Sequence, residues 1–103
     1  MIIPIQKEQI PNEFEIRLAG ELFTFEVHYN AEYDFFTVDL YKSGDVLVLG
    51  EKVVYDSPLF DTYSDERFPG VTITPLDRAD NEDRVTYSNL GNTVFLYVSD
   101  DDG

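Results

Sequence analysis

The stretch FEIRLAGELFTFEVHY, residues 14–29, alternates apolar and polar side chains on both sides of a short turn. Because successive side chains of a β-strand point to opposite faces of a sheet, a period of two predicts two strands, each with one apolar face. Ala19, Gly20 and Glu21 are typical of the tight turn between them. The predicted inward side chains are Phe14, Ile16, Leu18, Phe23, Phe25, Val27 and Tyr29. We therefore expect a hairpin with one face in water.

The same alternation continues after a polar turn at residues 30–34. The next inward set is Phe36, Val38 and Leu40, and the side chains on the opposite face are Phe35, Thr37, Asp39 and Tyr41. Residues 42–45 predict a second turn, in which Gly44 suits a positive backbone φ. The apolar run at 46–49 is interrupted by Gly50 and resumes at 53–55, a pattern that indicates a bulged strand.

Residues 56–70 predict an ordered loop. Pro58 and Pro69 interrupt the alternation, and acidic residues are frequent between them. The loop also carries four large apolar side chains that we expect to be exposed: Leu59, Phe60, Tyr63 and Phe68. Flexible linkers rarely contain so many large apolar groups, so the segment is expected to pack rather than to connect independent units.

The remaining sequence predicts two further strands. Residues 71–74 form a short strand that ends at Pro75, and residues 77–84 are polar and typical of a loop. Residues 94–98 form the last strand, where Val94, Leu96 and Val98 alternate with Phe95 and Tyr97. Residues 100–103 form an acidic tail that we expect to be disordered.

The expected fold is therefore all-β, with about seven short antiparallel strands in a small sandwich or partly open barrel and one long ordered loop. At 103 residues the chain has room for one hydrophobic core, so residues 1–103 are expected to form a single β domain. Residues 1–10 are its N-terminal strand or arm. We expect neither a signal-peptide core nor a membrane-spanning segment, because no apolar run is long enough.

The charge of the chain disfavours several classes of partner. Seven basic residues against twenty-one acidic ones give a net charge of −14, and the basic residues are scattered along the sequence. Non-specific affinity for nucleic acid comes mainly from cations that neutralise phosphates, so DNA, RNA and anionic lipid are not expected partners. The acidity itself is typical of solubility, with a basic partner surface or a crowded assembly as the alternative.

The sequence shows no catalytic or cofactor-binding motif. With so many acids, paired carboxylates carry no signal, and His28, the only histidine, occupies a polar position of a strand without a catalytic triad pattern. The chain has no cysteine, so thiolate chemistry and disulfides are excluded. Residues 77–83 offer carboxylates that a weak calcium site could use, but they lack the spacing of a calcium-binding loop. We predict no enzyme, no cofactor and no metal site.

Aromatic and apolar side chains in the loops favour an interaction role. The predicted protein-contact residues are Ile2, Ile3 and Ile5 in the N-terminal arm with Leu59, Phe60, Tyr63 and Phe68 in the 56–70 loop. Phe35, Tyr41 and Tyr97 add aromatic groups on the outer strand faces. The alternative is that the loop covers an open end of the sandwich and that both faces of one sheet are buried.

Three stretches together resemble the baseplate plug family of contractile-tailed phages and prophages. They are MIIPIQKEQIPNEFEIRLAGELFTFEVHYN (1–30), FFTVDLYKSGDVLVLGEKVVYDSPLF (35–60) and GVTITPLDRADNEDRVTYSNLGNTVFLYVSDDD (70–102). Each is similar to the family in its order of strands and turns, such as the Ser-Gly-Asp turn and the Leu-Gly break, rather than in a chemical signature.

The resemblance implies a structural, non-catalytic virion protein in the tail baseplate, made in the bacterial cytoplasm. The implied partners are other baseplate subunits, namely hub, tube or wedge proteins, and a homo-oligomer within the assembly is also possible. Two alternatives remain at this stage. One is a stand-alone β-sandwich that binds carbohydrate or peptide through its outer aromatics, and the other is a small hydrolase or calcium-dependent regulator that uses residues 77–83.

Overall fold

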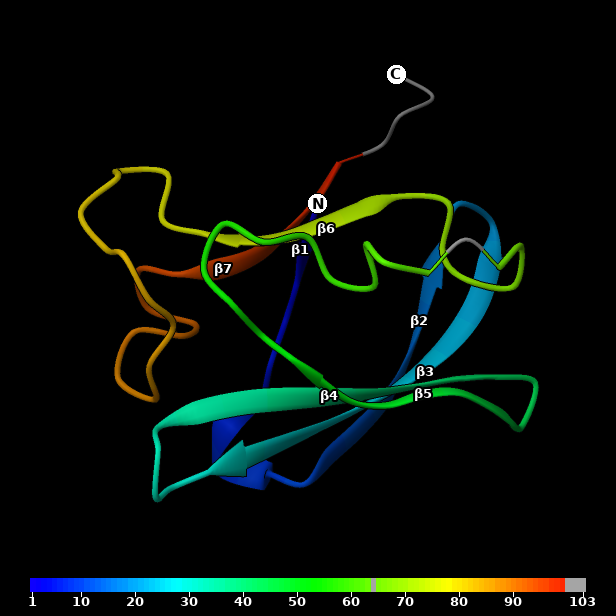
Figure 1. The fold of residues 1–103 in the computed structure, drawn as a ribbon, viewed down its shortest axis with the longest axis horizontal. Helices are drawn as coiled ribbons and strands as arrows, with labels where there is room; N and C mark the ends of the chain where they lie inside the picture. The colour runs from blue at the N-terminus through cyan, green and yellow to red at the C-terminus, as the bar shows by residue number, and fades with distance from the viewer. Residues whose placement is uncertain (64, 100–103) are drawn as a thin grey trace.

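The protein is built from two antiparallel sheets that face each other across one core, as the ribbon of the computed structural model shows (Figure 1). The structure describes residues 1–63 and 65–99, so the acidic residues 100–103 lie outside it. One sheet has the order β2 (Asn12–Leu18), β3 (Glu21–Asn30), β4 (Phe35–Lys42) and β5 (Asp45–Lys52). The other has the order β1 (Ile2–Ile3), β7 (Phe95–Ser99) and β6 (Thr72–Leu76). A short 3-10 helix, η1 (Lys7–Gln9), follows β1.

The all-β antiparallel sandwich predicted from the sequence is confirmed, and its described strands do not close into a barrel. The alternating side chains form the core as expected, since Phe25, Phe36, Val38 and Leu40 are completely buried. The opposite sheet closes the core with Ile3, Ile73 and Leu96. Because core residues come from both sheets and from the loops between them, one hydrophobic cluster joins all the strands.

Two hairpins of the larger sheet have two-residue turns with left-handed backbone at both positions. In the first turn Ala19 has φ 51° and Gly20 has φ 81°, and in the second Ser43 has φ 53° and Gly44 has φ 83°. Positive φ at both central residues matches the right-handed twist of the flanking strands, which is why such turns favour hairpins. The register that results pairs Phe14 with Phe25 and aligns the apolar sets of neighbouring strands.

The strand predicted to end at Pro75 continues to Leu76. Pro75 lies within β6, an edge strand, and its carbonyl accepts a hydrogen bond from the Asp56 amide at 2.8 Å. Within a strand the N–H and C=O of one residue point to the same side, so the missing N–H of Pro75 faces the 56–70 loop and not β7. The ladder between β6 and β7 therefore loses no hydrogen bond at this position.

Two long connections complete the core. The 56–70 loop runs from β5 to β6 and lies along β6, where the Leu59 amide donates to the Ile73 carbonyl at 2.8 Å. The second connection, residues 77–94, is organised by the buried Asn89, whose side-chain amide donates to the Arg84 carbonyl at 2.9 Å. Its buried side chains, Val85, Leu90 and Val94, belong to the hydrophobic core.

Asp34 fastens the 77–94 connection to the β3–β4 turn. Its carboxylate accepts hydrogen bonds from the Tyr29 hydroxyl at 2.7 Å and from the Tyr87 amide at 2.9 Å. Both bonds favour the ionised carboxylate and lower the pKa of Asp34, while the hydrogen bond to Asp34 raises the pKa of Tyr29.

Within the described ranges, no helix is both long and apolar enough to cross a membrane.

The positive φ of Ala19 predicts that a residue better suited to this conformation stabilises the turn. Ala19→Asn is expected to raise the free energy of unfolding by roughly 0.5–1 kcal/mol, because asparagine tolerates this conformation better than alanine. Urea unfolding measures the change. The matched control is Ala31→Asn, since Ala31 is also exposed and in a turn but is not among the residues with positive φ. Equal effects at the two positions would contradict the role of the Ala19 backbone.

Candidate functional site

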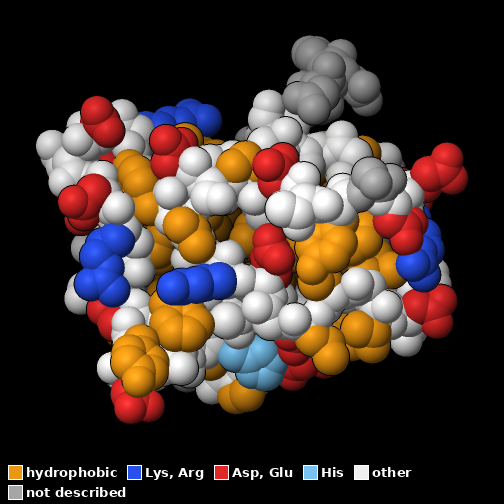
Figure 2. All heavy atoms as spheres, viewed as in Figure 1, with side chains coloured by type: hydrophobic (Ala, Val, Ile, Leu, Met, Phe, Trp, Pro, Cys, Tyr) orange, Lys and Arg blue, Asp and Glu red, His pale blue; other side chains and the backbone are white. Residues whose placement is uncertain are grey.

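The most exposed aromatic feature of the 56–70 loop is a stack of two rings. Tyr63 and Phe68 lie with their ring centroids 4.8 Å apart and their planes 5° from parallel. The residue Tyr63 is 43% exposed, while Phe68 is half-buried beneath it. Figure 2 shows hydrophobic side chains on the right of the viewed face, where this loop lies in Figure 1. We call Tyr63 and Phe68 the loop patch.

The structure corrects the expected exposure of two loop residues. Leu59 and Phe60 are each only 5% exposed and belong to the hydrophobic core. The Phe60 ring meets Phe25 edge-on at 6.1 Å and Phe68 at 6.0 Å, so an unbroken line of aromatic rings leads from the core to the loop patch. Their burial agrees with that part of the alternative in which the loop covers the core. The loop patch is thus supported from below by packed rings.

An ion pair shapes the same loop beside the patch. The Arg67 guanidinium donates from Nε and Nη2 to the Asp65 carboxylate, at 3.1 Å and 2.7 Å to Oδ2, and the Arg67 amide donates to Oδ1 at 2.9 Å. These bonds hold the pKa of the Asp65 carboxyl at about 2, below its usual value of 3.8. Both side chains are substantially exposed, so the pair orders the loop more than it adds stability.

The N-terminal arm contributes a second apolar surface. Ile3 is only 2% exposed and pairs with Leu96, so its side chain belongs to the core, and the protein contact predicted for it stays a prediction. Ile2 is 42% exposed, and Ile5 is half-buried against the core. The arm lines one side of a hollow of about 210 Å³ through residues 2–5. The other side is formed by Leu90, Gly91, Phe95 and Leu96. We call Ile2 and Ile5 the arm patch.

Cations cover two of the outer-face aromatics that sequence reasoning considered as stacking platforms. The Lys52 ammonium lies 4.6 Å from the centre of the Phe35 ring, and the Arg78 guanidinium lies 4.1 Å from the centre of the Tyr97 ring. A ring face already occupied by a cation is not free to stack on a sugar. Lys52 and Phe35 also line a hollow of about 370 Å³, together with Tyr33 and Arg84. The sequence did not predict this hollow.

The acidic segment 77–83 is held by its own backbone. The Asp77 carboxylate is buried and accepts hydrogen bonds from the amides of Ala79 at 2.9 Å and Asn81 at 3.0 Å. Its oxygens therefore stabilise the turn in the way typical of aspartate in loops. Among the described residues, the one group of three acids or histidines with converging ligand atoms lies elsewhere, so the geometry does not support a calcium site in this segment.

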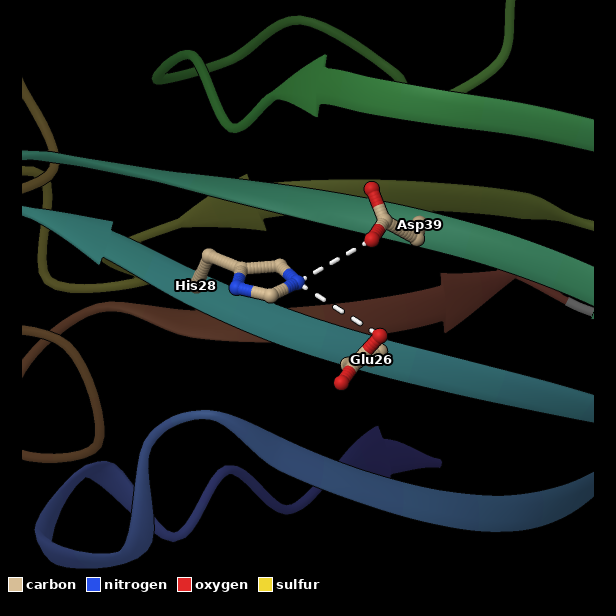
Figure 3. Close-up of side chains that lie close together, drawn as sticks. All are labelled: Glu26, His28 and Asp39. Carbon is tan, nitrogen blue, oxygen red and sulfur yellow. Dashed lines mark hydrogen bonds and ion pairs between the residues drawn. The ribbon is translucent and has the colours of Figure 1, made fainter.

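That converging group is Glu26, His28 and Asp39 on the outer face of β3 and β4 (Figure 3). His28 Nε2 lies 3.0 Å from Asp39 Oδ2 and 3.6 Å from Glu26 Oε1. The His28 side chain is 38% exposed and that of Asp39 13% exposed. Figure 2 shows the imidazole at the molecular surface with carboxylates beside it. The expectation that His28 occupies an outward strand position is met, but its two acidic partners were not predicted.

A β-bulge fixes the third member of this group. Leu49 and Gly50 of β5 lie opposite the single residue Asp39, because the register jumps from Val38 paired with Glu51 to Leu40 paired with Val48. Gly50 has φ 75°, and its freed amide donates to Asp39 Oδ1 at 2.7 Å. The bulge predicted at Gly50 is therefore confirmed, and it orients the Asp39 carboxylate.

Comparison with known proteins identifies the family. A family model described as cyanophage baseplate Pam3 plug gp18 matches residues 1–101. The chain belongs to this family. No curated protein matches the sequence. The resemblance to phage baseplate plugs inferred from the order of strands and turns is therefore confirmed.

Membership in this family supports a structural role in a phage baseplate and a location in the virion tail. It implies association with other baseplate components. It also favours a non-enzymatic role. The family match does not assign contacts to residues, so the loop patch and the arm patch remain predictions.

The Asp65–Arg67 pair gives a testable pKa. Titration of the carboxyl carbons by NMR should find the Asp65 pKa at about 2, and Arg67→Gln should return it toward 3.8. Because the folded-state pKa is lowered, the pair contributes its stability above the unfolded-state pKa and loses it as the pH falls toward 2. Arg17→Gln removes an arginine that does not contribute to the Asp65 pKa shift, so as a control it should leave this pKa unchanged.

The aromatic line from core to surface predicts very different costs at neighbouring positions. Phe60→Ala should lower the free energy of unfolding by about 3–5 kcal/mol, because it leaves a cavity in the core. Tyr63→Ala should lower the free energy of unfolding by about 1 kcal/mol or less, since it removes only the exposed ring of the stack. Urea unfolding of both variants is the measurement. Similar losses at the two positions would show that the assigned burial is wrong.

Proposed function

We propose that the protein acts as a plug-like structural component of a contractile-tail baseplate, close to the hub and tube, through contacts with neighbouring subunits. The match to a baseplate plug family over residues 1–101 is the observation on which this proposal depends. The partner classes that we propose are hub, tube or wedge proteins. We also propose that the chain serves in this role as one β domain, since its single core cluster draws residues from both sheets.

Two separate apolar surfaces support docking to more than one neighbour. The loop patch sits on the connection between β5 and β6, and the arm patch lies beside β1 and β7. Both combine exposed apolar groups with a supporting layer of buried side chains, a composition common at the centres of protein interfaces. A component that fills space between subunits needs contact surfaces on several sides.

The acidic surface is suited to selecting partners. A net charge of −14 repels other copies of the chain and any acidic subunit, while it attracts a basic surface over several ångströms. Charged groups around an apolar patch mainly enforce the correct partner and register and contribute less to affinity. The proposed neighbours are accordingly subunits with basic contact surfaces.

The alternative of a stand-alone carbohydrate- or peptide-binding module has weaker support. Its proposed stacking platforms included Phe35 and Tyr97, whose ring faces are covered by Lys52 and Arg78. The third, Tyr41, is half-buried and lies among carboxylates, so that burial and then Asp39, Glu26 and Glu13 raise its pKa. Two of these three rings therefore have a face occupied by a cation, and the third is only partly exposed.

Tyr63→Ala tests the proposed contact role of the loop patch. In tail particles assembled with this variant, incorporation of the protein should fall several-fold, because the exposed ring is lost while the fold is retained. Quantitative mass spectrometry of purified tails measures the stoichiometry relative to a tube subunit. The matched control is Tyr33→Ala, which removes the same side chain from a different and more exposed position, 67% exposed.

Three outcomes of this experiment are distinguishable. Loss with Tyr63→Ala alone supports the loop patch, and equal loss with Tyr33→Ala would contradict its specificity. Normal incorporation of both variants would remove the loop patch from the proposal. Absence of the parent protein from purified tails would contradict the baseplate role itself.

A further inference from the structure

The outer face of the larger sheet carries a row of three acidic residues in direct cross-strand register. Glu13 of β2 pairs with Glu26 of β3, and Glu26 pairs with Asp39 of β4. Like charges directly opposite each other destabilise a sheet, so this row is an unfavourable arrangement unless a cation lies beside it. Among the described side chains, the ion pairs of Glu26 and Asp39 are both with His28.

His28 is placed where one cation could reach both carboxylates. It is diagonal to Asp39 across the β3–β4 ladder, since its own partner there is Thr37. Its Nε2 and one oxygen from each carboxylate all lie within 4.8 Å of one another. Three ligands about 2.0–2.2 Å from a tetrahedral zinc ion lie roughly 3.3–3.6 Å apart, so small side-chain movements suffice to enclose an ion.

We propose that Glu26, His28 and Asp39 form a binding site for a divalent transition-metal ion of the zinc class. One imidazole and two carboxylates suit zinc better than calcium or magnesium, which prefer oxygen ligands alone. The hydrogen bond from the Gly50 amide orients the Asp39 carboxylate from behind, as the outer partners of metal ligands commonly do. A fourth coordination position would face solvent.

The strand arrangement around the site also favours a defined binding site over a chance group of surface side chains. Its ligands come from two adjacent strands, and the bulge that orients Asp39 brings in a third strand. An ion at this point would offset the repulsion of the acidic row and would link β3 to β4 through side chains. Binding should therefore stabilise the folded protein in proportion to the metal concentration.

The experiment uses the untagged protein and zinc chloride, with calcium chloride in parallel. Because His28 is the only histidine, its ring nitrogens are observed without ambiguity by NMR. We expect zinc at micromolar concentration to shift the Nε2 resonance of His28 and to raise the melting temperature, whereas calcium at equal concentration leaves both unchanged. No shift of Nε2 with zinc would overturn the proposal.

Variants separate a defined site from general attraction to an acidic surface. His28→Gln and Glu26→Gln should each weaken zinc binding measured by calorimetry by about tenfold or more. Glu13→Gln is the matched control, since it removes one negative charge from the same row without removing a ligand, and it should bind zinc within a few-fold of the parent. If His28→Gln binds as the parent does, or if Glu13→Gln loses as much affinity as Glu26→Gln, the acids act only as a diffuse charge.

Discussion

The fold depends on the register that places β3 between β2 and β4. In this register Phe25 lies between Phe14 and Leu40, and the buried side chains of β3 and β4 form one continuous apolar face. A slip of one residue in either ladder would expose these side chains to solvent and would place charged groups in the core. The two-residue turns at 19–20 and 43–44 help to exclude that slip, because they fix which residues pair at the hairpin ends. Turn geometry and burial therefore select the same pairing.

The register also determines what the outer face of the sheet contains. Because side chains alternate, burying Val27 and Val38 necessarily places Glu26 and Asp39 outward and next to each other. The acidic row is thus a direct consequence of the pattern that builds the core. The bulge at Gly50 adds a hydrogen bond to Asp39 that no regular ladder could supply.

The sequence predicts what depends on local pattern and misses what depends on contacts across the fold. The strands, the turns, the bulge and the inward side chains follow from period-two alternation and from glycine positions, and they appear in the structure. The exception is the strand predicted to resume at 53–55, since β5 ends at Lys52. The burial of Ile3, Leu59 and Phe60 does not follow, since each contacts elements distant in sequence and apolar residues in a loop look alike whether they cover a core or a partner. Strand β6 passes through Pro75 because of a contact with the loop at Asp56, which no local rule encodes. Of the two partners of His28, Glu26 lies two residues earlier on the same strand and so on the same face by alternation, whereas Asp39 depends on strand pairing and was beyond the sequence pattern.

The loop patch, which we propose as a docking surface, is supported by a line of packed rings although the domain is small. Tyr63 stacks on Phe68, Phe68 contacts Phe60, and Phe60 packs against Phe25 in the core. A partner that docks on Tyr63 would therefore meet a side chain that is already ordered, and ordering exposed side chains is a substantial cost of association. Since Phe60 belongs to the core, its loss would weaken folding together with the proposed docking, whereas loss of Tyr63 would affect mainly the proposed docking. The contribution of the loop to folding and its proposed contribution to docking can therefore be separated best at its outermost ring, Tyr63.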